Sequence, residues 1–405
     1  MFTFHHTFYR RLLKSLTFFC ILLLLEVFSF AAPPEVEEIH RAIDQSSSYL
    51  QQSLKEDGMF QYSINMDPAI NDKGGYNILR HAGTIYSLSL AYQLKPDEEL
   101  KECIARATRY LQQEAIATVP FHDPMMAVWS RPEVNKTKDH FQAKLGGAGL
   151  GLVALVSMED IQPGFTSLAT LQSIGHFIMY MQRKDGSFYA KYIPSEGGRW
   201  DEWQSLYYPG EAALGLLMLH TKDPSGDWLE AAVKALQYLA QTRKNQSDVL
   251  PDHWALLATE KLLALEQHPD VPVDRALLIA HAVQICESLL STHITDTSRP
   301  IYLGGFDTHG STSTTSTTLE GLQAALSFLP QNHPMRIRIE KVLPSSIRFL
   351  LRAQVKTGTY AGAFPHAVGR IDDQEPDADY YNSFTTEVRI DYVQHAMSAL
   401  IQYID

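Results

Sequence analysis

Residues 145–158 read LGGAGLGLVALVSM, a stretch of fourteen positions without a charged side chain. The stretch is too long for an ordinary strand, and half of its residues are Gly, Ala or Ser. A helix that is apolar on all its sides is buried on all its sides, and small residues let neighbouring helices approach closely. The stretch therefore predicts a helix in the interior of the protein, packed between other helices.

Five more stretches have the same largely apolar, Ala-rich character, and they are separated by amphipathic ones. The apolar stretches are residues 80–94, 209–220, 252–265, 317–329 and 391–404. The amphipathic stretches are residues 36–55, 97–114, 166–182, 227–242, 274–291 and 337–354. In one of these, Leu100, Cys103, Ile104 and Ala107 follow the i, i+3, i+4, i+7 spacing of a half-exposed helix. The chain therefore alternates outer and inner helices along its length.

This alternation predicts an all-α fold, an (α/α)6 toroid made by residues 32–405 as a single domain. Six helical hairpins would close into a ring, with an inner six-helix barrel inside an outer six-helix barrel. The alternative is an open helical solenoid, which needs polar capping repeats at its two ends. Neither end of the chain carries such a repeat, so the closed ring is favoured.

A short turn motif follows several of the outer helices. It reads LKEDGMFQY at 54–62, MQRKDGSFYAKY at 181–192 and AQVKTGTYAGAF at 353–364. Asp-Gly supplies a turn, and the aromatic residue packs back against the helix ends. These segments resemble the Gln-Gly-aromatic repeats of terpenoid-cyclase and prenyltransferase toroids. The layout of residues 36–405 also resembles the six-hairpin glycosidase group, which includes hydrolases, lyases and sugar epimerases. The resemblance implies the toroid fold and a carbohydrate or similar polar ligand.

Several classes of function are disfavoured by what the sequence lacks. It has no Asp-x-Asp-Asp motif for protonating an alkene, as a terpenoid cyclase would need. Cys103 and Cys286 lie on apolar helix faces, which predicts two buried thiols rather than a disulfide or a zinc site. We therefore expect no metal and no cofactor. The formal net charge of −12 repels phosphates, so nucleic acid is excluded as a partner.

The first residues have the pattern of a secretory signal peptide. Arg10, Arg11 and Lys14 precede an apolar run over 16–25, and small residues follow at 29–31. We expect residues 1–31 to be removed on export, leaving a periplasmic or extracellular protein. The alternative is an uncleaved anchor, in which case the membrane would be contacted through this segment alone.

The candidate site lies at one end of the predicted ring. Long loops rich in aromatic, acidic and His residues lead into the inner helices, whereas the connections at 93–99 and 220–228 are short and polar. The starts of the inner helices would gather at the end with the long loops, where helix N-termini favour anionic groups. Some residues there are explained by capping: Asp252 as an N-cap, Thr317 with Glu320 as a capping box, and Pro209 and Glu211 in a first turn. The run GSTSTTSTT at 310–318 is expected to be a polar loop.

Three histidines, His81, His253 and His395, lie near the starts of inner helices. A core histidine is the simpler explanation for any one of them, but three at equivalent heights indicate a site. Neutral imidazoles exchange protons near pH 7, so a pair across a cavity could serve opposite faces of one carbon. The arrangement resembles that of the N-acylglucosamine 2-epimerase group. The resemblance implies His253 and His395 as the catalytic pair and Arg80 as the cation beside them.

Carboxylates provide a second possible chemistry, glycoside cleavage, which needs one protonated and one ionised acid. Asp201 and Glu202 lie between Trp200 and Trp203, and Asp379 is a candidate partner. Aromatic faces stack on sugar rings, and apolar surroundings raise a carboxyl pKa. The residues expected to contact substrate are Arg80, His81, Tyr76, Trp200, Trp203, Tyr207, Tyr208, Trp254, Tyr380, Tyr381 and Arg389.

Arg80 has two explanations, because a cation at a buried helix start is unfavourable unless an anion meets it. The anion is either a carboxylate of the chain, such as Asp379 or Asp391, or an acidic group of the ligand. Taken together, the sequence predicts an exported carbohydrate-active protein, acting as a hydrolase, lyase or epimerase. The alternative is a non-catalytic glycan-binding or assembly protein that uses the same surface.

Overall fold

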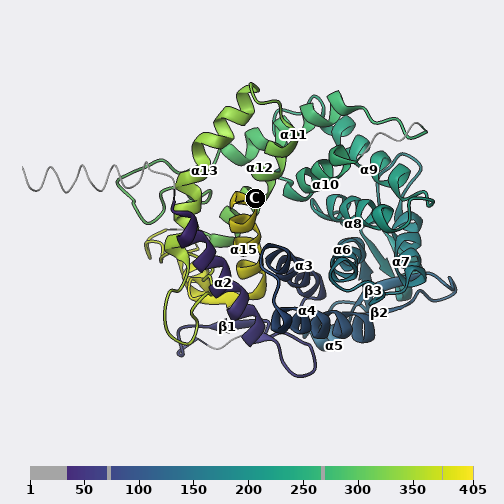
Figure 1. Cartoon of the computed structure of the whole chain (residues 1–405), viewed down its shortest axis with the longest axis horizontal. Helices are drawn as coiled ribbons and strands as arrows, with labels where there is room; N and C mark the ends of the chain where they lie inside the picture. Colours follow the sequence, from purple (N-terminus) through teal and green to yellow (C-terminus); the bar gives the residue numbers. More distant parts are fainter. Residues whose placement is uncertain (1–33, 71–73, 266–269, 376, 405) are drawn as a thin grey trace, which may run out of the picture.

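The computed structural model describes residues 34–70, 74–265, 270–375 and 377–404. These residues form a ring of helices in two concentric layers (Figure 1), as the alternation of apolar and amphipathic stretches predicted. The expected signal peptide at 1–31 lies outside the described residues. No helix in the described ranges combines the length and the apolar character that crossing a membrane requires.

The inner layer is a closed barrel. Its helices are α3 (Ile78–Leu94), α6 (Leu145–Ile161), α8 (Tyr208–Lys222), α10 (His253–Ala264), α12 (Thr312–Phe328) and α15 (Ile390–Ile404). Each helix packs against the next, and α15 packs against α3 to close the ring. This closure excludes the open solenoid, whose first and last repeats would not touch.

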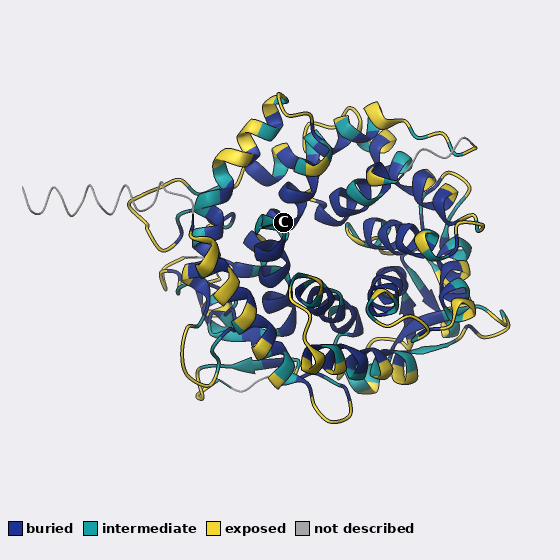
Figure 2. Cartoon of the chain, viewed as in Figure 1, coloured by how far each residue is buried: buried dark blue, intermediate teal, exposed yellow. Residues whose placement is uncertain are grey.

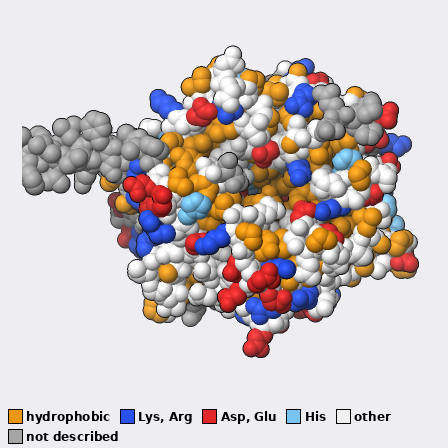
Figure 3. All heavy atoms as spheres, in the orientation of Figure 1, with side chains coloured by type: hydrophobic (Ala, Val, Ile, Leu, Met, Phe, Trp, Pro, Cys, Tyr) orange, Lys and Arg blue, Asp and Glu red, His pale blue; other side chains and the backbone are white. Residues whose placement is uncertain are grey.

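The outer layer surrounds the barrel. Its helices are α2 (Val36–Ser53), α4 (Glu98–Tyr110), α7 (Leu168–Met181), α9 (Trp228–Arg243), α11 (Arg275–Leu290) and α13 (Pro334–Ala353). A π-helical turn, Leu111–Ala115, continues α4. Figure 2 shows the inner helices buried and the outer helices exposed along one side, as their periodicity predicted. Charged side chains of both signs are spread over the visible surface (Figure 3).

Close contacts explain why the stretch at 145–158 is rich in glycine. A Cβ added to Gly149 would lie 2.4 Å from the carbonyl oxygen of Glu211 on the next inner helix. A Cβ on Gly215 would lie 2.6 Å from the carbonyl oxygen of Gly149. The helices α6 and α8 therefore touch backbone to backbone, which a larger residue at either position would prevent.

The turn motif ties neighbouring outer helices together. Gly186 has φ of +97°, which an L side chain rarely adopts, so the turn requires glycine there. The Gln before the turn also makes a specific contact, because its side-chain amide reaches the neighbouring outer helix. Gln182 donates to the carbonyl of Ala231 at 2.9 Å, and Gln354 donates to the carbonyl of Ala42 at 2.8 Å. These bonds satisfy buried polar groups and fix the spacing of the outer layer.

Short strands, which the sequence analysis did not predict, lie among the loops. β1 (Ser63–Asn65) pairs with β7 (Glu387–Arg389). A second sheet has the order β2 (Ile116–Thr118), β3 (Met126–Ser130), β4 (Gln142–Lys144), β5 (Lys191–Ile193), β6 (Gly198–Trp200). Runs of three to five residues are too short to show the alternation that identifies a strand. The remaining short elements are α5 (Pro132–Asn135), α14 (Ala378–Phe384) and a 3-10 turn, Pro194–Glu196.

The expectation for the Ser/Thr run at 310–318 was wrong, since α12 begins at Thr312. Ser311 caps the helix by accepting from the Thr314 amide at 3.2 Å. Within the run, hydroxyls bond to carbonyls four residues back, as Ser316 does to Thr312 at 2.7 Å, so the polar side chains are satisfied inside a helix. Thr317 and Glu320 consequently lie inside α12 and form no capping box.

The other local expectations for caps and cysteines are confirmed. Asp252 caps α10 by accepting from the Ala255 amide at 3.1 Å. Pro209 and Glu211 lie in the first turn of α8. Cys103 and Cys286 are buried free thiols, and burial raises the pKa of each to about 12.

Candidate active site

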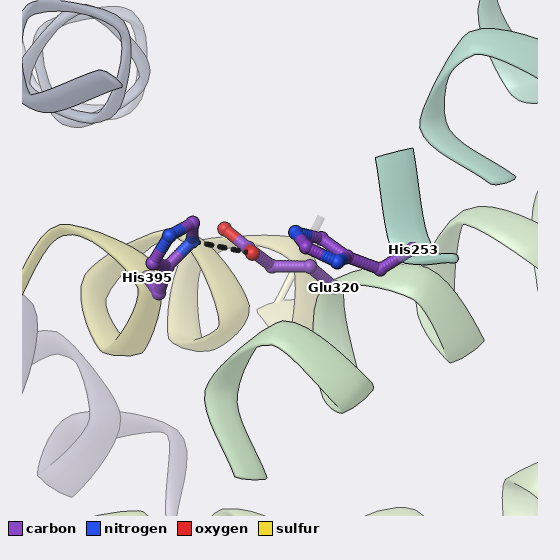
Figure 4. A group of neighbouring side chains, drawn as sticks. All are labelled: His253, Glu320 and His395. Carbon is purple, nitrogen blue, oxygen red and sulfur yellow. Dashed lines mark hydrogen bonds and ion pairs between the residues drawn. The ribbon is translucent and has the colours of Figure 1, made fainter. Parts of the chain in front are cut away.

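Three side chains from three inner helices meet at the end of the ring where these helices begin, which we call the mouth. His253 of α10, Glu320 of α12 and His395 of α15 point toward one another (Figure 4). One nitrogen or oxygen atom from each lies within 4.8 Å of those of the other two. The Nδ1 atom of His395 is 2.8 Å from Oε2 of Glu320, and the two imidazole centroids are 5.9 Å apart. The two rings therefore meet edge to face.

Local packing places His253 in this cluster. It is the first residue of α10, directly after the capping Asp252. The facing position on α12 is Gly321, where an added Cβ would lie 3.0 Å from the Cβ of His253. A side chain at Gly321 would therefore push α10 and α12 apart and separate His253 from Glu320.

The two histidines have pKa values shifted in opposite directions. Burial, and to a smaller extent His395, holds the pKa of His253 well below its usual value. Its Nε2 atom is buried without a hydrogen-bond partner. Burial acts on His395 in the same direction, but Glu320 and Asp391 outweigh it, so the pKa of His395 is raised. One imidazole is therefore neutral and the other is held toward its protonated form, which is the arrangement of a base and an acid.

Asp391 connects this cluster to Arg80. The Nε atom of Arg80 is 3.0 Å from Asp391, and Arg389 makes two contacts with the same carboxylate at 2.7 and 2.8 Å. Arg80 also donates to the hydroxyl of Tyr62. The chain's own carboxylate therefore meets Arg80, which is the first of the two explanations. The Arg80 side chain is still 35% exposed, so part of the guanidinium faces solvent.

Glu211, on the first turn of α8, is a second buried carboxyl beside the site. Its Oε2 atom has no hydrogen-bond partner, whereas the neighbouring Asp252 pairs with Arg243 at 3.0 Å. Burial, together with the charge of Asp252, raises the pKa of Glu211 to about 8. Gly146 leaves room for it, since a Cβ there would lie 1.9 Å from Oε2. Glu211 is therefore a neutral acid at pH 7.

Aromatic residues predicted to contact substrate border the cluster. The Tyr207 ring is 5.1 Å from that of His253, and it is 38% exposed. Trp254 is buried, with its ring 5.2 Å from His253 and 6.3 Å from His395. Tyr207 therefore forms part of the accessible surface of the site, and Trp254 forms part of its wall.

Two residues predicted for substrate binding lie elsewhere, in the core. His81 is fully buried, with Nδ1 2.6 Å from the Tyr76 hydroxyl and Nε2 2.8 Å from the Ala107 carbonyl. Tyr76 is also buried, and its hydroxyl accepts a hydrogen bond from the Phe60 amide. Both nitrogens of His81 are engaged between α3 and α4. The prediction that it contacts substrate was wrong, because its side chain has no exposed surface, whereas that of its neighbour Arg80 is 35% exposed.

The carboxylates of the glycosidase hypothesis are exposed to solvent. Asp201 pairs with Arg183 and accepts from Gln204, and Glu202 is exposed beside it. Asp379 is exposed on α14. None of the three therefore lies in the apolar pocket that the hypothesis required. On the same helix, Tyr380 is 64% exposed and Tyr381 stacks on His309 at 4.2 Å.

Asp391 was predicted as a possible partner of Arg80, which the structure confirms, whereas Glu320 and Glu211 were predicted only as capping or first-turn residues. The signal was present for Glu320: a single carboxylate stood inside a helix predicted to be apolar on all sides. A buried charge of this kind requires a partner, and the partner is His395.

The set His253, Glu320 and His395 also has the donor atoms that Zn²⁺ prefers. No metal was expected from the sequence, and Glu320 already has a protein partner in His395.

Elsewhere, a groove of about 680 Å³ lies between α2 and the turn that joins α3 to α4. Its lining contains Ala91, Leu94 and Lys95 at the far end of α3, so it is separate from the mouth.

No family model and no curated protein matches the sequence. Solved structures resemble the fold. A sugar epimerase from a ruminal bacterium aligns with a TM-score of 0.65 at 12% identity, over 91% of this chain and 98% of that one. A D-mannose isomerase aligns with a TM-score of 0.61 at 12% identity, over 91% and 97%. An α-1,6-mannanase from a Salegentibacter species aligns with a TM-score of 0.59 at 10% identity, over 90% and 99%.

The fold is an (α/α)6 toroid, shared with these three enzymes. At such low identity the likeness concerns the fold alone, and it identifies no specific family. The neighbours named above act on carbohydrates by different reactions, so the reaction has to be argued from the side chains of this chain.

Proposed function

We propose that the protein is a sugar epimerase or isomerase that moves a proton at the carbon next to the carbonyl of a reducing sugar. The observation that carries the proposal is the pair of imidazoles, 5.9 Å between centroids, with pKa values shifted in opposite directions. The likeness to a sugar epimerase and a D-mannose isomerase supports it. The exposed carboxylates Asp201 and Asp379 give a glycosidase no comparable support.

The proposed reaction needs one base and one acid. Neutral His253 takes the proton from C2 of the open-chain sugar, while protonated His395 gives a proton to the carbonyl oxygen, which yields an enediol. For the epimer, His395 takes the proton back from O1 and delivers it to the opposite face of C2, which restores the aldehyde, and the two histidines regain their starting protonation states by exchange with solvent. Return of a proton to C1, with loss of the hydroxyl proton at O2, gives the isomeric ketose. Glu320 keeps His395 protonated before the reaction, and Arg80 orients the sugar through its exposed edge.

The experiment follows solvent deuterium. The purified protein is incubated in D₂O with D-glucose, D-mannose, D-fructose and D-glucuronate, and proton NMR follows the C2–H signal of the three aldoses and the C1–H signals of fructose. The proposal predicts loss of such a signal for at least one sugar, with appearance of the epimer or ketose. His253→Gln and His395→Gln should lower the rate by about 10²–10⁴-fold. His176→Gln, at an exposed position on α7, is the matched control.

Two outcomes would contradict the proposal. Release of reducing ends from an oligosaccharide without deuterium at C2 would identify a glycosidase. Sugar binding without exchange or cleavage would identify a non-catalytic binding protein.

The proposal includes export, on the pattern of residues 1–31. N-terminal sequencing of protein from its native host should find a mature end near Ala32. An intact Met1 on a membrane-bound product would favour an anchor instead.

A further inference from the structure

Two lysines lie directly opposite each other at the rim of the mouth. In the antiparallel pair β4–β5, Lys144 is in register with Lys191, and in the pair β5–β6, Lys191 is in register with Trp200. Residues in register share one face of a sheet, so the three side chains form a row. Like charges placed opposite each other destabilise a sheet. The two cations therefore carry a cost that sheet formation does not explain.

The ammonium group of Lys144 has no hydrogen-bond or ion-pair partner among the residues that the structure describes, although its side chain is half-buried. Burial lowers its pKa, and the charges of Lys191 and Arg80 add to this effect, while the exposed Asp139 acts in the opposite direction. Lys144 is also the residue before α6, whose positive end faces the same mouth. The surroundings of Lys144 therefore disfavour its charged form.

Apart from the exposed Asp139, the carboxylates Asp391 and Glu387 near the rim are already paired with arginines. Arg80 and Arg389 share Asp391, and Glu387 lies 3.6 Å from Arg389. These contacts leave neither carboxylate for Lys144. The rim thus has an excess of positive charge in a chain whose formal net charge is −12.

An aromatic surface leads from the rim lysines to the start of α8, where Glu211 lies. The Nζ atom of Lys191 lies 5.2 Å from the Trp200 ring and 4.8 Å from the Trp203 ring. Trp203 is 44% exposed and meets Tyr208 edge to face at 5.6 Å between centroids. Tyr208 packs toward Gly146, where Glu211 also lies. Exposed aromatic faces of this kind stack on sugar rings, and the row of cations borders them.

We infer that Lys144 and Lys191 bind the carboxylate of an acidic sugar, beside the aromatic surface of Trp200 and Trp203. The substrate class of the proposed reaction is then hexuronates rather than neutral hexoses. The carboxylate at C6 would meet the rim lysines, while the carbonyl end of the open chain reaches the histidine pair. The inference on substrate class rests on the proposed function, whereas binding of the acidic sugar does not.

The test measures binding by titration calorimetry with D-glucuronate and D-glucose, at low and at raised salt. The native protein should bind glucuronate about tenfold more tightly than glucose, because a charge-assisted contact is lost with the neutral sugar. The preference should weaken as salt rises. Glucose 6-phosphate is included as a second anionic sugar, and preference for it over glucuronate would overturn the assignment to a carboxylate.

Lys144→Met removes the charge and keeps the length of the side chain, so it should weaken glucuronate binding more than glucose binding and reduce the preference, with Lys191 still present. Lys144→Arg should restore part of the preference. Lys95→Met is the matched control, since Lys95 pairs with Asp44 at the far end of α3. The melting temperature of Lys144→Met should stay the same or rise, because the lysine lacks a partner. If this variant fails to fold, Lys191→Met tests the same preference.

Equal affinity for glucuronate and glucose in the native protein, or an unchanged preference in Lys144→Met, would overturn the inference. The two proposals fail separately. Tight glucuronate binding without deuterium exchange would contradict the proposed reaction and leave the acidic-sugar site standing. Deuterium exchange on neutral hexoses without glucuronate binding would support the proposed reaction and contradict the acidic-sugar site.

Discussion

At the scale of single residues, the site depends on unequal surroundings for chemically equal groups. His253 and His395 are both imidazoles on inner helices, but only His395 has a carboxylate partner, Glu320 at 2.8 Å. Asp252 and Glu211 are both buried carboxyls, but only Asp252 has a cation, Arg243 at 3.0 Å. The pKa values of the two histidines are shifted in opposite directions, whereas those of both carboxyls are raised, that of Glu211 to about 8.

The partner of Arg80 leads to a prediction about stability. Replacing Arg80 by Ala removes one of the two cations that meet Asp391, but Arg389 remains at 2.7 and 2.8 Å. The carboxylate is not left unpaired, so the loss should be about 1 kcal/mol in the free energy of unfolding, measured with denaturant. Arg41→Ala, at an exposed position on α2, is the control. A loss above about 3 kcal/mol, the size expected for a broken buried pair, would mean that Arg389 does not compensate.

At the scale of elements, glycines set how closely the inner helices approach and so where the site residues lie. Gly146 on α6 makes room for Glu211 and Tyr208 of α8, and Gly321 on α12 makes room for His253 of α10. Gly83 on α3 faces the amide of Gln394 on α15, where a Cβ would lie 2.5 Å from Nε2. The small residues that identified the inner helices in the sequence thus also shape the polar mouth.

Gly146→Ala tests this role. The added Cβ would lie 1.9 Å from Oε2 of Glu211 and 2.5 Å from Cδ1 of Tyr208, so both side chains must move. We expect a loss of about 1–3 kcal/mol in the free energy of unfolding together with reduced sugar turnover. Gly147→Ala, on the same helix, would meet Leu79 at 3.3 Å and the Val128 carbonyl oxygen at 3.6 Å, and it should change both quantities less. Equal effects of the two substitutions would contradict a specific role for Gly146.

The sequence predicted the helices well and the site only in part, for physical reasons. Helices of twelve to twenty residues have a clear periodicity, and the apolar inner helices differ from the amphipathic outer ones. The strands are too short for a pattern. The run at 312–318 looked like a loop because hydroxyls that bond within a helix resemble hydroxyls that face water. His81 and His253 stand at similar positions on their helices, and only the packing shows that one faces α4 and the other the mouth.

At the scale of the whole molecule, the ring is closed by contact between its last inner helix and its first. Residues far apart in sequence meet at this seam: Thr84 donates to Gln394 at 2.7 Å, and Ser87 donates to the carbonyl of Gln394 at 2.8 Å. Arg80 and Asp391 lie at the same seam. Closure of the ring therefore assembles the site, since α3 supplies Arg80 and α15 supplies His395.

The buried Glu211 links pH to the stability of the whole molecule. Its pKa is about 8 in the folded protein, above the ordinary value of 4.5. Between these values the folded state holds a proton that the unfolded state has lost. Stability from this group is therefore present below about pH 4.5 and falls as pH rises toward 8, by at most about 1.4 kcal/mol per pH unit. Melting temperatures from pH 5 to 8 should fall less steeply in Glu211→Gln, and an unchanged slope would contradict the assignment.

The central claim is that the two histidines of the mouth hold different protonation states, and NMR titration of their ring protons tests it directly. Resonances are assigned with His253→Gln and His395→Gln. His395 should titrate above its ordinary value of 6.5, and Glu320→Gln should lower its pKa, whereas His253 should stay neutral well below 6.5. Protonation of both rings at the same pH, or of His253 before His395 as pH falls, would contradict the assignment of His253 as base and His395 as acid.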